Sequence, residues 1–504
     1  MNTNQAQATA PTFKKAPIVV ALLIGAFVAI LNQTLMNVAL PKMMADLNVE
    51  TTTIQWLTTG FMLVNGVLIP ISAYLMERFT TRKLFITAMI LFSIGTVICG
   101  IGSSFSMVLV GRLIQAAGAG VLMPLMTVIF LTIFPIEKRG QAMGMMGIAM
   151  IFAPAVGPTL SGWIIEHHSW HLLFWLILPF GVLSVLLGIF FMKNVTKVSN
   201  PKLDVLSVIL STLGFGGILY GFSEAGSSND GWSGPEVIIS LVVGVVALAL
   251  FLWRQLVSEK PILEFRVFKY NMFSLTTVVN VVVTMALYAA MILLPIYLQN
   301  IRGFTPLKSG LLLMPGAILM GIMSPITGII FDKIGARWLA VIGLAITTVT
   351  TWEFSNLSET TTYTHLILLY TVRMFGMSMV MMPIQTAGLN QLPARLNAHG
   401  TAMSNTLRTI AGALGTALLV TIMTNQTKDR VKELIVSQGV NPQDKLAMAQ
   451  ITKEATIHGI DYAFVVATGI TLLAFILAFF IRRVAINKEG AEAPLETKTV
   501  SAKG

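Results

Sequence analysis

A chain of 504 residues with 55% hydrophobic residues, only 11% charged residues and a mean hydropathy of +0.79 is too apolar for a water-soluble protein. Soluble domains carry about a quarter charged residues. The net charge of +11 could indicate a nucleic-acid partner, but basic cytoplasmic loops of a membrane protein give the same excess. The single cysteine, Cys99, excludes an intramolecular disulfide. We therefore expect a membrane protein with no nucleic-acid partner.

Apolar stretches of roughly 17–28 residues, the length that crosses a bilayer, recur along the chain. The first is too long for a signal-peptide core and lacks a small-residue cleavage site, so we expect it to be retained. The pattern predicts an all-α polytopic membrane protein with fourteen transmembrane spans. They lie near residues 17–40, 55–76, 84–102, 106–134, 141–165, 170–192, 204–222, 236–256, 271–298, 307–330, 338–354, 364–388, 400–424 and 460–481.

Basic residues between the spans predict the orientation. If the N-terminus is inside, 22 of the 33 Lys and Arg residues fall in inside segments and eight in outside segments, five of them in the long segment 425–459. The positive-inside rule then places both termini in the cytoplasm. Segment 425–459 has mixed charge, and we expect a short surface helix there.

Sequence motifs of catalysis are absent. The chain contains no G-x-x-x-x-G-K-[ST], no H-E-x-x-H and no G-x-S-x-G. His167 and His171 have the i, i+4 spacing of metal ligands, but no further ligand accompanies them. We therefore expect no enzyme, no cofactor and no metal, and an ion gradient as the energy source for any active transport.

An internal repeat indicates two homologous halves. Segment 73–82, "AYLMERFTTR", and segment 328–337, "GIIFDKIGAR", share an acid, a cation and an arginine at matching positions, 255 residues apart. "GQAM" at 140–143 recurs as "GTAM" at 400–403, and Arg112 recurs as Arg373. The predicted division is a cytoplasmic tail at 1–16, an N-terminal six-span half at 17–192, an inserted two-span linker at 193–270, a C-terminal six-span half at 271–481 and a cytoplasmic tail at 482–504.

Polar side chains inside the spans are candidates for an internal cavity. Arg112 is the sharpest case, because a cation facing lipid costs between about 2.5 and more than 10 kcal/mol, so it should face protein or water. Each such side chain could instead form an interhelical hydrogen bond. The methionines at 377, 379, 381 and 382 either fill the core or form an adaptable apolar pocket. The predicted cavity residues are Asn32, Gln33, Asn37, Asn65, Arg112, Gln115, Asn280, Thr284, Tyr288, Gln385, Asn405 and Arg408.

Two further sets of residues are candidates for conformational change. The repeated acid and base positions, Glu77, Arg78, Arg82, Asp332 and Arg337, could form a latch between conformations or only a positive-inside topology signal. The span at 141–165 contains small residues and prolines that let another helix approach closely. It could be a flexible seam or a static packing surface, and its residues are Gly144, Gly147, Pro154, Gly157, Pro158 and Gly162.

Titratable groups inside the spans are the least defined feature of the sequence, because no carboxylate lies clearly inside a span. Glu224, Glu353 and Asp461 lie at span ends, where interfacial placement with ordinary acidity is the alternative. Glu224 and Asp461 are the candidates for proton coupling.

These motifs resemble those of the major facilitator superfamily, in its fourteen-span drug:proton antiporter branch (EmrB/QacA type). The resemblance rests on "LNQTLMNVALP" at 31–41, "YLMERFTTRK" at 74–83, "GRLIQAAGAG" at 111–120 and "APAVGPTLSGW" at 153–163. It implies the major facilitator fold, two six-helix bundles plus two additional helices, and proton-coupled export. Two positions depart from the family pattern: Asn32 replaces a frequent aspartate, and Thr80 replaces a glycine that Gly335 preserves in the second half.

The resulting hypothesis is a secondary active multidrug exporter of a bacterial plasma membrane. It would bind small amphipathic substrates between its halves, use protons as the coupling ion and need no obligatory protein partner. An importer or facilitator of a defined metabolite is one alternative. A membrane sensor or scaffold that moves no compound is another.

Overall fold

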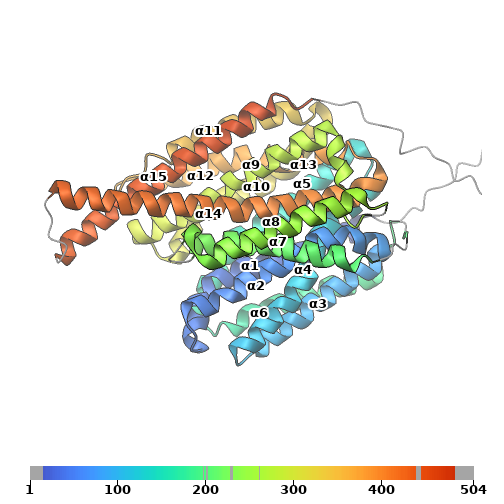
Figure 1. Ribbon diagram of the computed structural model, residues 1–504, viewed down its shortest axis with the longest axis horizontal. Helices are drawn as coiled ribbons and strands as arrows, with labels where there is room; N and C mark the ends of the chain where they lie inside the picture. Colours follow the sequence, from blue (N-terminus) through green and yellow to red (C-terminus); the bar gives the residue numbers. More distant parts are fainter. Residues whose placement is uncertain are drawn as a thin grey trace, which may run out of the picture.

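The computed structural model describes residues 15–196, 198–199, 203–227, 231–259, 261–438 and 444–482. This part of the chain is helical and contains no strand. Thirteen of its helices are long and apolar enough to cross a membrane, and they run side by side along the long axis of the molecule (Figure 1). Helices satisfy every backbone hydrogen bond within the segment, which lipid requires because it offers no partners.

The first bundle contains six helices. α1 packs against α5 and α6, α4 packs against α2 and α3, and α3 packs against α6. Serine and threonine begin two of these helices, because the Thr80 hydroxyl accepts from Lys83 N and the Ser104 hydroxyl accepts from Met107 N. The bounds are α1 Lys15–Asp46, α2 Thr51–Arg78, α3 Thr81–Ile101, α4 Phe105–Ile133, α5 Arg139–His167, after the short η1 Ile136–Lys138, and α6 His171–Phe191.

The second bundle also contains six spans. α9 packs against α14, α15 and α13, α10 packs against α12, and α11 packs against α12 and α15. The bounds are α9 Asn271–Ile296 with the π-helical turn η4 Tyr297–Ile301, α10 Pro306–Ile334, α11 Ala336–Glu353, α12 Tyr363–Ser378, α13 Met381–Leu389, η5 Ala394–Leu396, α14 Asn397–Gln438 and α15 Lys445–Ala478. α5 lies along α10 and α2 lies along α14, so these two helix pairs join the bundles.

An inserted helical pair lies between the bundles in sequence. α7 (Val205–Ser227) and α8 (Pro235–Val257) pack on each other, with η2 (Gly231–Ser233) between them. α7 also contacts α2 and α14, so the pair covers one of the two lines along which the bundles meet (Figure 1).

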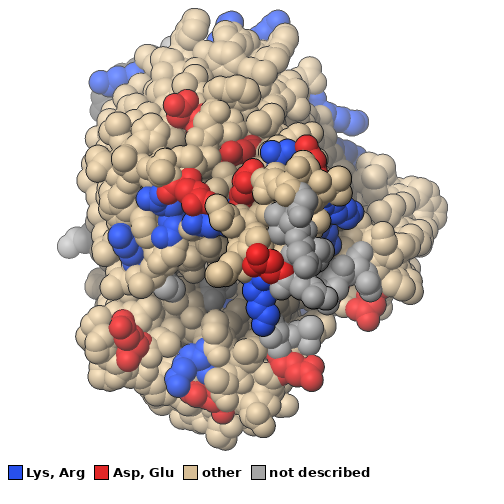
Figure 2. All heavy atoms as spheres, turned by 90° about the vertical axis from the view of Figure 1, so that its left-hand side faces the viewer, with Lys and Arg blue, Asp and Glu red and all other residues tan. Residues whose placement is uncertain are grey.

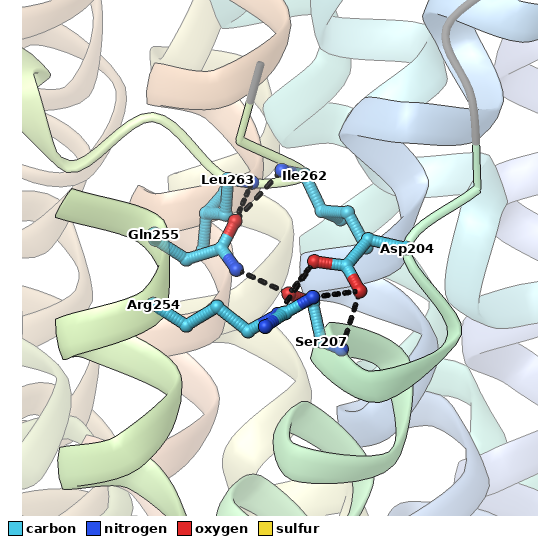
Figure 3. A network of polar contacts seen from close by, with 6 residues as sticks. All are labelled: Asp204, Ser207, Arg254, Gln255, Ile262 and Leu263. Atoms are coloured by element: carbon cyan, nitrogen blue, oxygen red, sulfur yellow. Dashed lines mark hydrogen bonds and ion pairs between the residues drawn. The ribbon is translucent and has the colours of Figure 1, made fainter. Parts of the chain in front are cut away.

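A polar network joins the two inserted helices at one end (Figure 3). Arg254 donates to both carboxylate oxygens of Asp204, at 2.7 and 2.9 Å, and Asp204 accepts from the Ser207 hydroxyl at 2.6 Å. Gln255 donates to the Ser207 hydroxyl, and its side-chain oxygen accepts from the amides of Ile262 and Leu263. The connection after α8, which includes η3 (Phe265–Lys269), is therefore fixed to the start of α7.

Two predicted spans differ from their expected form. The span at 338–354 corresponds to α11, whose 18 residues are long enough to cross but include Arg337, Glu353 and four threonines, so it is not among the thirteen apolar helices of the described part. The span at 364–388 is broken between α12 and α13. Pro383 has no N–H to donate to the carbonyl four residues earlier, which accounts for a break at this point. The Thr327 hydroxyl donates to the carbonyl of Ser378 beside the break, at 2.9 Å.

The departure from the family pattern at Thr80 has a local explanation. Gly335 has φ +83°, a conformation that favours glycine, and it links α10 directly to α11. Thr80 has φ −67° and ψ 145°, which suits any residue, and its side chain caps α3. The first half therefore replaces a glycine turn with an N-cap.

The prediction of a short surface helix within 425–459 was wrong. α14 and α15 continue beyond the bundle as two long helices, which contact each other through Leu434, Ile451 and Ala455 (Figure 1). We call this projection the hairpin, and the end of the molecule that carries it the hairpin end. No glycine or proline interrupts α14 at the predicted boundary near 424, and α15 continues through Gly459, which packs closely against Thr427 of α14.

The opposite end, here the terminal end, holds the start of α1, where Lys15 lies over the Phe134 ring. Figure 2 views the hairpin end, where basic and acidic side chains gather across the face. The sides of the bundle expose large apolar residues instead, such as Ile239, Trp253 and Val257 on α8, with 63%, 65% and 69% exposure. This division matches an apolar surface for lipid between two polar ends.

Candidate functional site

Arg112 is held inside the first bundle by a neutral polar network. Its side chain is fully buried; Nε donates to the carbonyl of Leu57 at 3.2 Å, and Nη1 donates to the side-chain oxygen of Gln115 at 3.0 Å. The guanidinium carbon also lies 4.2 Å from the centroid of the Phe61 ring, which adds a cation–π contact. No carboxylate is needed to keep this cation in the interior, because carbonyl, amide and aromatic groups surround it.

Gln115 connects this arginine to two other helices. Its side-chain oxygen also accepts from Asn32 Nδ2 at 3.1 Å, and its Nε2 donates to the Thr96 hydroxyl at 2.7 Å. Asn32, in the position where the family often has an acid, is 2% exposed and therefore belongs to the network. Asn32, Arg112 and Gln115 were predicted from sequence, whereas Thr96 was missed because a threonine on an apolar helix carries no distinctive signal.

The other predicted polar residues of the first bundle do not join this network. Gln33 on α1 and Asn65 on α2 are half-buried, with no hydrogen bond of their side chains found among the described residues. The side chain of Asn37 lies outside what the structure describes.

Arg373 in the second bundle repeats the position of Arg112 with different partners. It is fully buried; its Nε donates to the Thr351 hydroxyl at 3.3 Å, and its Nη2 donates to the carbonyl of Ala286 at 2.9 Å. Gly343 and Gly376 allow α11 and α12 to approach closely beside it, since a Cβ on Gly343 would lie 2.6 Å from the carbonyl oxygen of Gly376.

A polar face of α9 meets a polar face of α14. Asn280, Thr284 and Tyr288 are spaced four residues apart on α9, and the Thr284 hydroxyl donates to the carbonyl of Asn280. Gly412 of α14 lies against the ring of Tyr288, where a Cβ would be 2.8 Å from the ring. Asn405 and Arg408 lie on the same side of α14, three residues apart.

A narrow pocket lies beside these faces, and in this conformation it leaves no free space for a water-sized molecule. Gln385 contributes to it from α13, between the other two helices. Gln385 and Asn405 are each 3% exposed, and both amide atoms of each side chain lack a hydrogen-bond partner among the described residues. The pocket is lined by Phe273, Thr276, Thr277, Asn280, Gln385, Gly388 and Ser404.

The predicted latch acids both reach across to the opposite bundle at the terminal end. Asp332 accepts from the backbone N–H groups of Gly140 and Gln141, at 2.8 and 3.0 Å, in the first turn of α5. A carboxylate is favoured there because helix N-termini present unpaired N–H groups and positive potential.

Glu77 makes the corresponding contact from the first bundle. Its Oε1 lies 3.0 Å from Nε2 of His399 on α14, and Nδ1 of His399 accepts from Glu264 N at 3.3 Å. If Nδ1 is the acceptor, neutral His399 carries its proton on Nε2 and donates it to Glu77. His399 precedes "GTAM" as Arg139 precedes "GQAM", so the repeat could have suggested it. Arg139 donates to the side-chain oxygen of Asn390 at 3.1 Å, which adds a third contact between the bundles.

The predicted latch cations do not take part in these contacts. Arg82 ties the start of α3 to the end of α6 by donating to the carbonyl of Ile189. Arg78 is exposed, and Arg337 is exposed beside the ring of Trp338. The acids therefore contact the opposite bundle, whereas the cations make no hydrogen bond or ion pair with it among the described residues.

The predicted seam in α5 divides between two neighbours. Gly144 and Gly147 lie against Ser324 of α10, so any side chain at either position would collide with it. Gly157 lies against Thr34 of α1, whose hydroxyl donates to the carbonyl of Ala153 at 3.3 Å. Pro154 and Pro158 lie within the helix and are half-buried, and Gly162 has no neighbour that a Cβ would meet.

The candidate proton carriers lie away from the pocket. Asp461 is half-buried on α15, and its carboxylate accepts from Leu357 N, in the connection between α11 and α12, at 3.2 Å. Glu224 is half-buried near the end of α7 and interacts electrostatically with Tyr220. Glu353 is exposed at the end of α11.

Comparisons with known proteins place this arrangement in context. The profile of the Major Facilitator Superfamily matches residues 22–416. Lincomycin resistance protein LmrB of Bacillus subtilis is 47% identical over 475 residues, which cover 94% of this chain and 97% of LmrB. Multidrug export protein EmrB of Escherichia coli K12 is 28% identical, covering 92% of this chain and 94% of EmrB. The solved structure of the proton:xylose symporter XylE matches with a TM-score of 0.60 at 13% identity, over 93% of this chain and 96% of XylE, and shares its fold.

Proposed function

Since the chain belongs to the major facilitator superfamily, we propose that it is a secondary active exporter of amphipathic drugs or toxic compounds, coupled to protons and working by alternating access. The observation that supports this most is the pair of acids that cross between the bundles at the terminal end, Asp332 to α5 and Glu77 to α14. Contacts of this kind hold one end closed and can break as a unit. Relatives named for lincomycin resistance and multidrug export support the substrate class and a role in antibiotic resistance.

In this proposal, each group of predicted residues has a separate task. The polar faces around Gln385, Asn405 and Arg408 bind substrate, and the network of Asn32, Arg112 and Gln115 supports the cavity from the first bundle. Asp332 and Glu77 form the latch, and the glycines of α5 allow the bundles to move against each other. In this proposal, the chain consists of two six-span halves, at 17–192 and 271–481, which the two-span linker 193–270 joins. Both termini lie in the cytoplasm of a bacterial cell.

Proton coupling requires a group that alternates between protonation states as the protein changes conformation. We propose Asp461 ahead of Glu224, because its half-buried carboxylate lies in the second bundle, where it accepts from a loop amide at the hairpin end. Glu224 lies on the inserted pair, away from the polar faces of the pocket.

Transport in liposomes tests the proposal. Purified protein is reconstituted with a fluorescent amphipathic dye, and dye movement is followed with and without an imposed pH gradient. We expect transport against the dye gradient only when the pH gradient is present. Movement without gradient dependence would favour a facilitator, and no movement of any compound would favour a sensor or scaffold.

A further inference from the structure

Three arginines, Arg112, Arg373 and Arg408, lie inside the predicted spans rather than near helix ends, and they are not equivalent. Arg112 and Arg373 are fully buried, and each donates to a backbone carbonyl and to a neutral side chain of its own bundle. Only one terminal nitrogen of each remains without a partner among the described residues. Both therefore have their charge surrounded by protein dipoles, which leaves little need for a ligand.

Arg408 differs from these two arginines in its burial and in its hydrogen-bond partners. It lies on α14 about three turns after the first residue of that helix, yet its side chain is partly accessible rather than buried. Among the described residues, no hydrogen bond or ion pair involves its guanidinium, and its electrostatic neighbour is Tyr288 of α9. A permanent cation inside a membrane protein without an anion is costly unless water or an anionic ligand reaches it.

The groups beside Arg408 are also unsatisfied. Asn405, one turn earlier on the same side of α14, has neither its amide nitrogen nor its amide oxygen hydrogen-bonded. The same holds for Gln385, which lines the pocket together with Ser404. Natural proteins rarely leave four buried amide atoms unpaired in one region, so these atoms are expected to bond to molecules that enter it.

These groups together select one kind of ligand. A guanidinium presents planar donors that match a carboxylate or sulfonate, and the Tyr288 hydroxyl can donate to the same anion. Buried amides both donate and accept, so they bind carbonyl or hydroxyl groups next to it. A cationic group would meet repulsion from Arg408, and no carboxylate among the pocket-lining residues offsets it.

We propose that Arg408 and Tyr288, flanked by Asn405 and Gln385, form a subsite for the anionic group of an amphipathic organic anion. The subsite lies in the second bundle alone, between α9, α13 and α14. It rests on the proposed export function for its place in a transport cycle, but binding at the subsite can be measured without transport.

A matched set of pyrene probes tests the subsite. Binding of pyrenebutyrate, its methyl ester and a pyrenebutyl-trimethylammonium salt to the purified full chain is measured by equilibrium dialysis. We expect the wild-type protein to bind the carboxylate more tightly than the ester, and the ester more tightly than the ammonium compound. Arg408→Gln should weaken binding of the carboxylate about tenfold or more, the equivalent of one charge-assisted hydrogen bond, and change binding of the ester less than twofold.

Further variants separate charge from folding. Arg408→Lys should retain part of the preference for the carboxylate, because it keeps the charge but loses the planar fork. Arg430→Gln, in the hairpin, removes the same charge far from the subsite and should leave all three affinities unchanged. Equal weakening of carboxylate and ester by Arg408→Gln, or an unchanged affinity for the carboxylate, would overturn the proposal, as would a wild-type protein that binds none of the probes.

Transport of the same probes distinguishes this proposal from the general one. If the wild-type protein exports the ester and the ammonium compound under a pH gradient but Arg408→Gln leaves carboxylate binding intact, export stands and the subsite is wrong. If Arg408→Gln abolishes carboxylate binding while no probe moves in liposomes, the subsite stands and the export function is wrong.

Discussion

The interior polar groups of the two bundles are arranged in opposite ways. In the first bundle, Asn32, Arg112 and Gln115 bond to one another and to backbone, so their polar groups are largely used within the protein. In the second bundle, the amides of Gln385 and Asn405 have no partners, and the guanidinium of Arg408 has none among the described residues. The polar residues around Arg112 therefore bond to one another, whereas those around Arg408 lack partners among the described residues, although the second bundle also holds a partnered arginine, Arg373.

Removal of Arg112 should have the largest effect, because it breaks the partnered network at its centre. Arg112→Ala leaves the Leu57 carbonyl and the Gln115 oxygen with one donor fewer, and hydrogen bonds to charged groups contribute about 1.5–3 kcal/mol each. We expect transport to be abolished while membrane insertion is preserved, as measured by dye export and by the amount of protein in the membrane. Arg112→Lys should rescue poorly because lysine lacks the planar fork. Wild-type export by a well-expressed Arg112→Ala protein would show that the network is dispensable.

The two latch acids at the terminal end also differ between the bundles in the bonds that they make. Asp332 of the second bundle bonds to two backbone amides, whereas Glu77 of the first bundle bonds to one side chain. Asp332→Asn should shift the balance between conformations about tenfold, the equivalent of one charge-assisted bond. Glu77→Gln should shift it less, about fivefold or below, because this pair is partly exposed and screened.

Labelling of a cysteine measures these shifts. In a Cys99→Ala background, Ser404→Cys places a thiol in the pocket lining, and its reaction with a water-soluble maleimide reports opening. His399→Ala should reproduce the effect of Glu77→Gln, because it removes the same contact from the other side. Unchanged labelling in both acid variants would mean that these residues only signal membrane topology and do not form a latch.

The sequence predicted the membrane-spanning helices and the fold well, because these depend mainly on the length of apolar stretches. Lys15–Asp46 and the other long helices follow from apolar length alone, and Arg373, the counterpart of Arg112 in the repeat, is buried as well. The sequence could not separate partnered from unpartnered polar groups, because that depends on which helices meet. Thr96 was missed because a threonine on an apolar helix carries no distinctive signal, and His399 was missed although the repeat places it opposite Arg139. The hairpin was misjudged because its mixed charge suggested a surface helix of its own.

Asn32→Asp should have a smaller effect on transport. The substitution places a titratable carboxylate in the network around Arg112 and keeps the arginine. The substitution replaces a donor to Gln115 by a carboxylate, which Arg112 stabilises when ionised and burial disfavours. We expect a new pH dependence of export, or a gain of cationic substrates, measured as transport rates from pH 5 to 8. A variant that folds, reaches the membrane and keeps the wild-type substrate range and pH profile would mean that Asn32 only packs the bundle.

The smallest effect is expected at the inserted pair, which belongs to neither polar region. Hydrogen bonds from the Arg254 guanidinium hold the pKa of Asp204 down to about 2, against the opposing effect of burial. Because the folded-state pKa lies below the value of about 3.9 in an unfolded chain, this contact contributes fully above that value and is lost only as the pH falls towards 2.

Asp204→Asn should therefore lower export slightly and by a constant factor between pH 5 and 8, because Asp204 stays ionised throughout that range. The measurement is the ratio of variant to wild-type transport at each pH, with Glu236→Gln, on the same pair, as the control. A ratio that changes across this range would show that α7 and α8 take part in proton coupling. The contrast between the bundles would then be incomplete, because a third region would carry a proton-dependent function that neither set of polar residues explains.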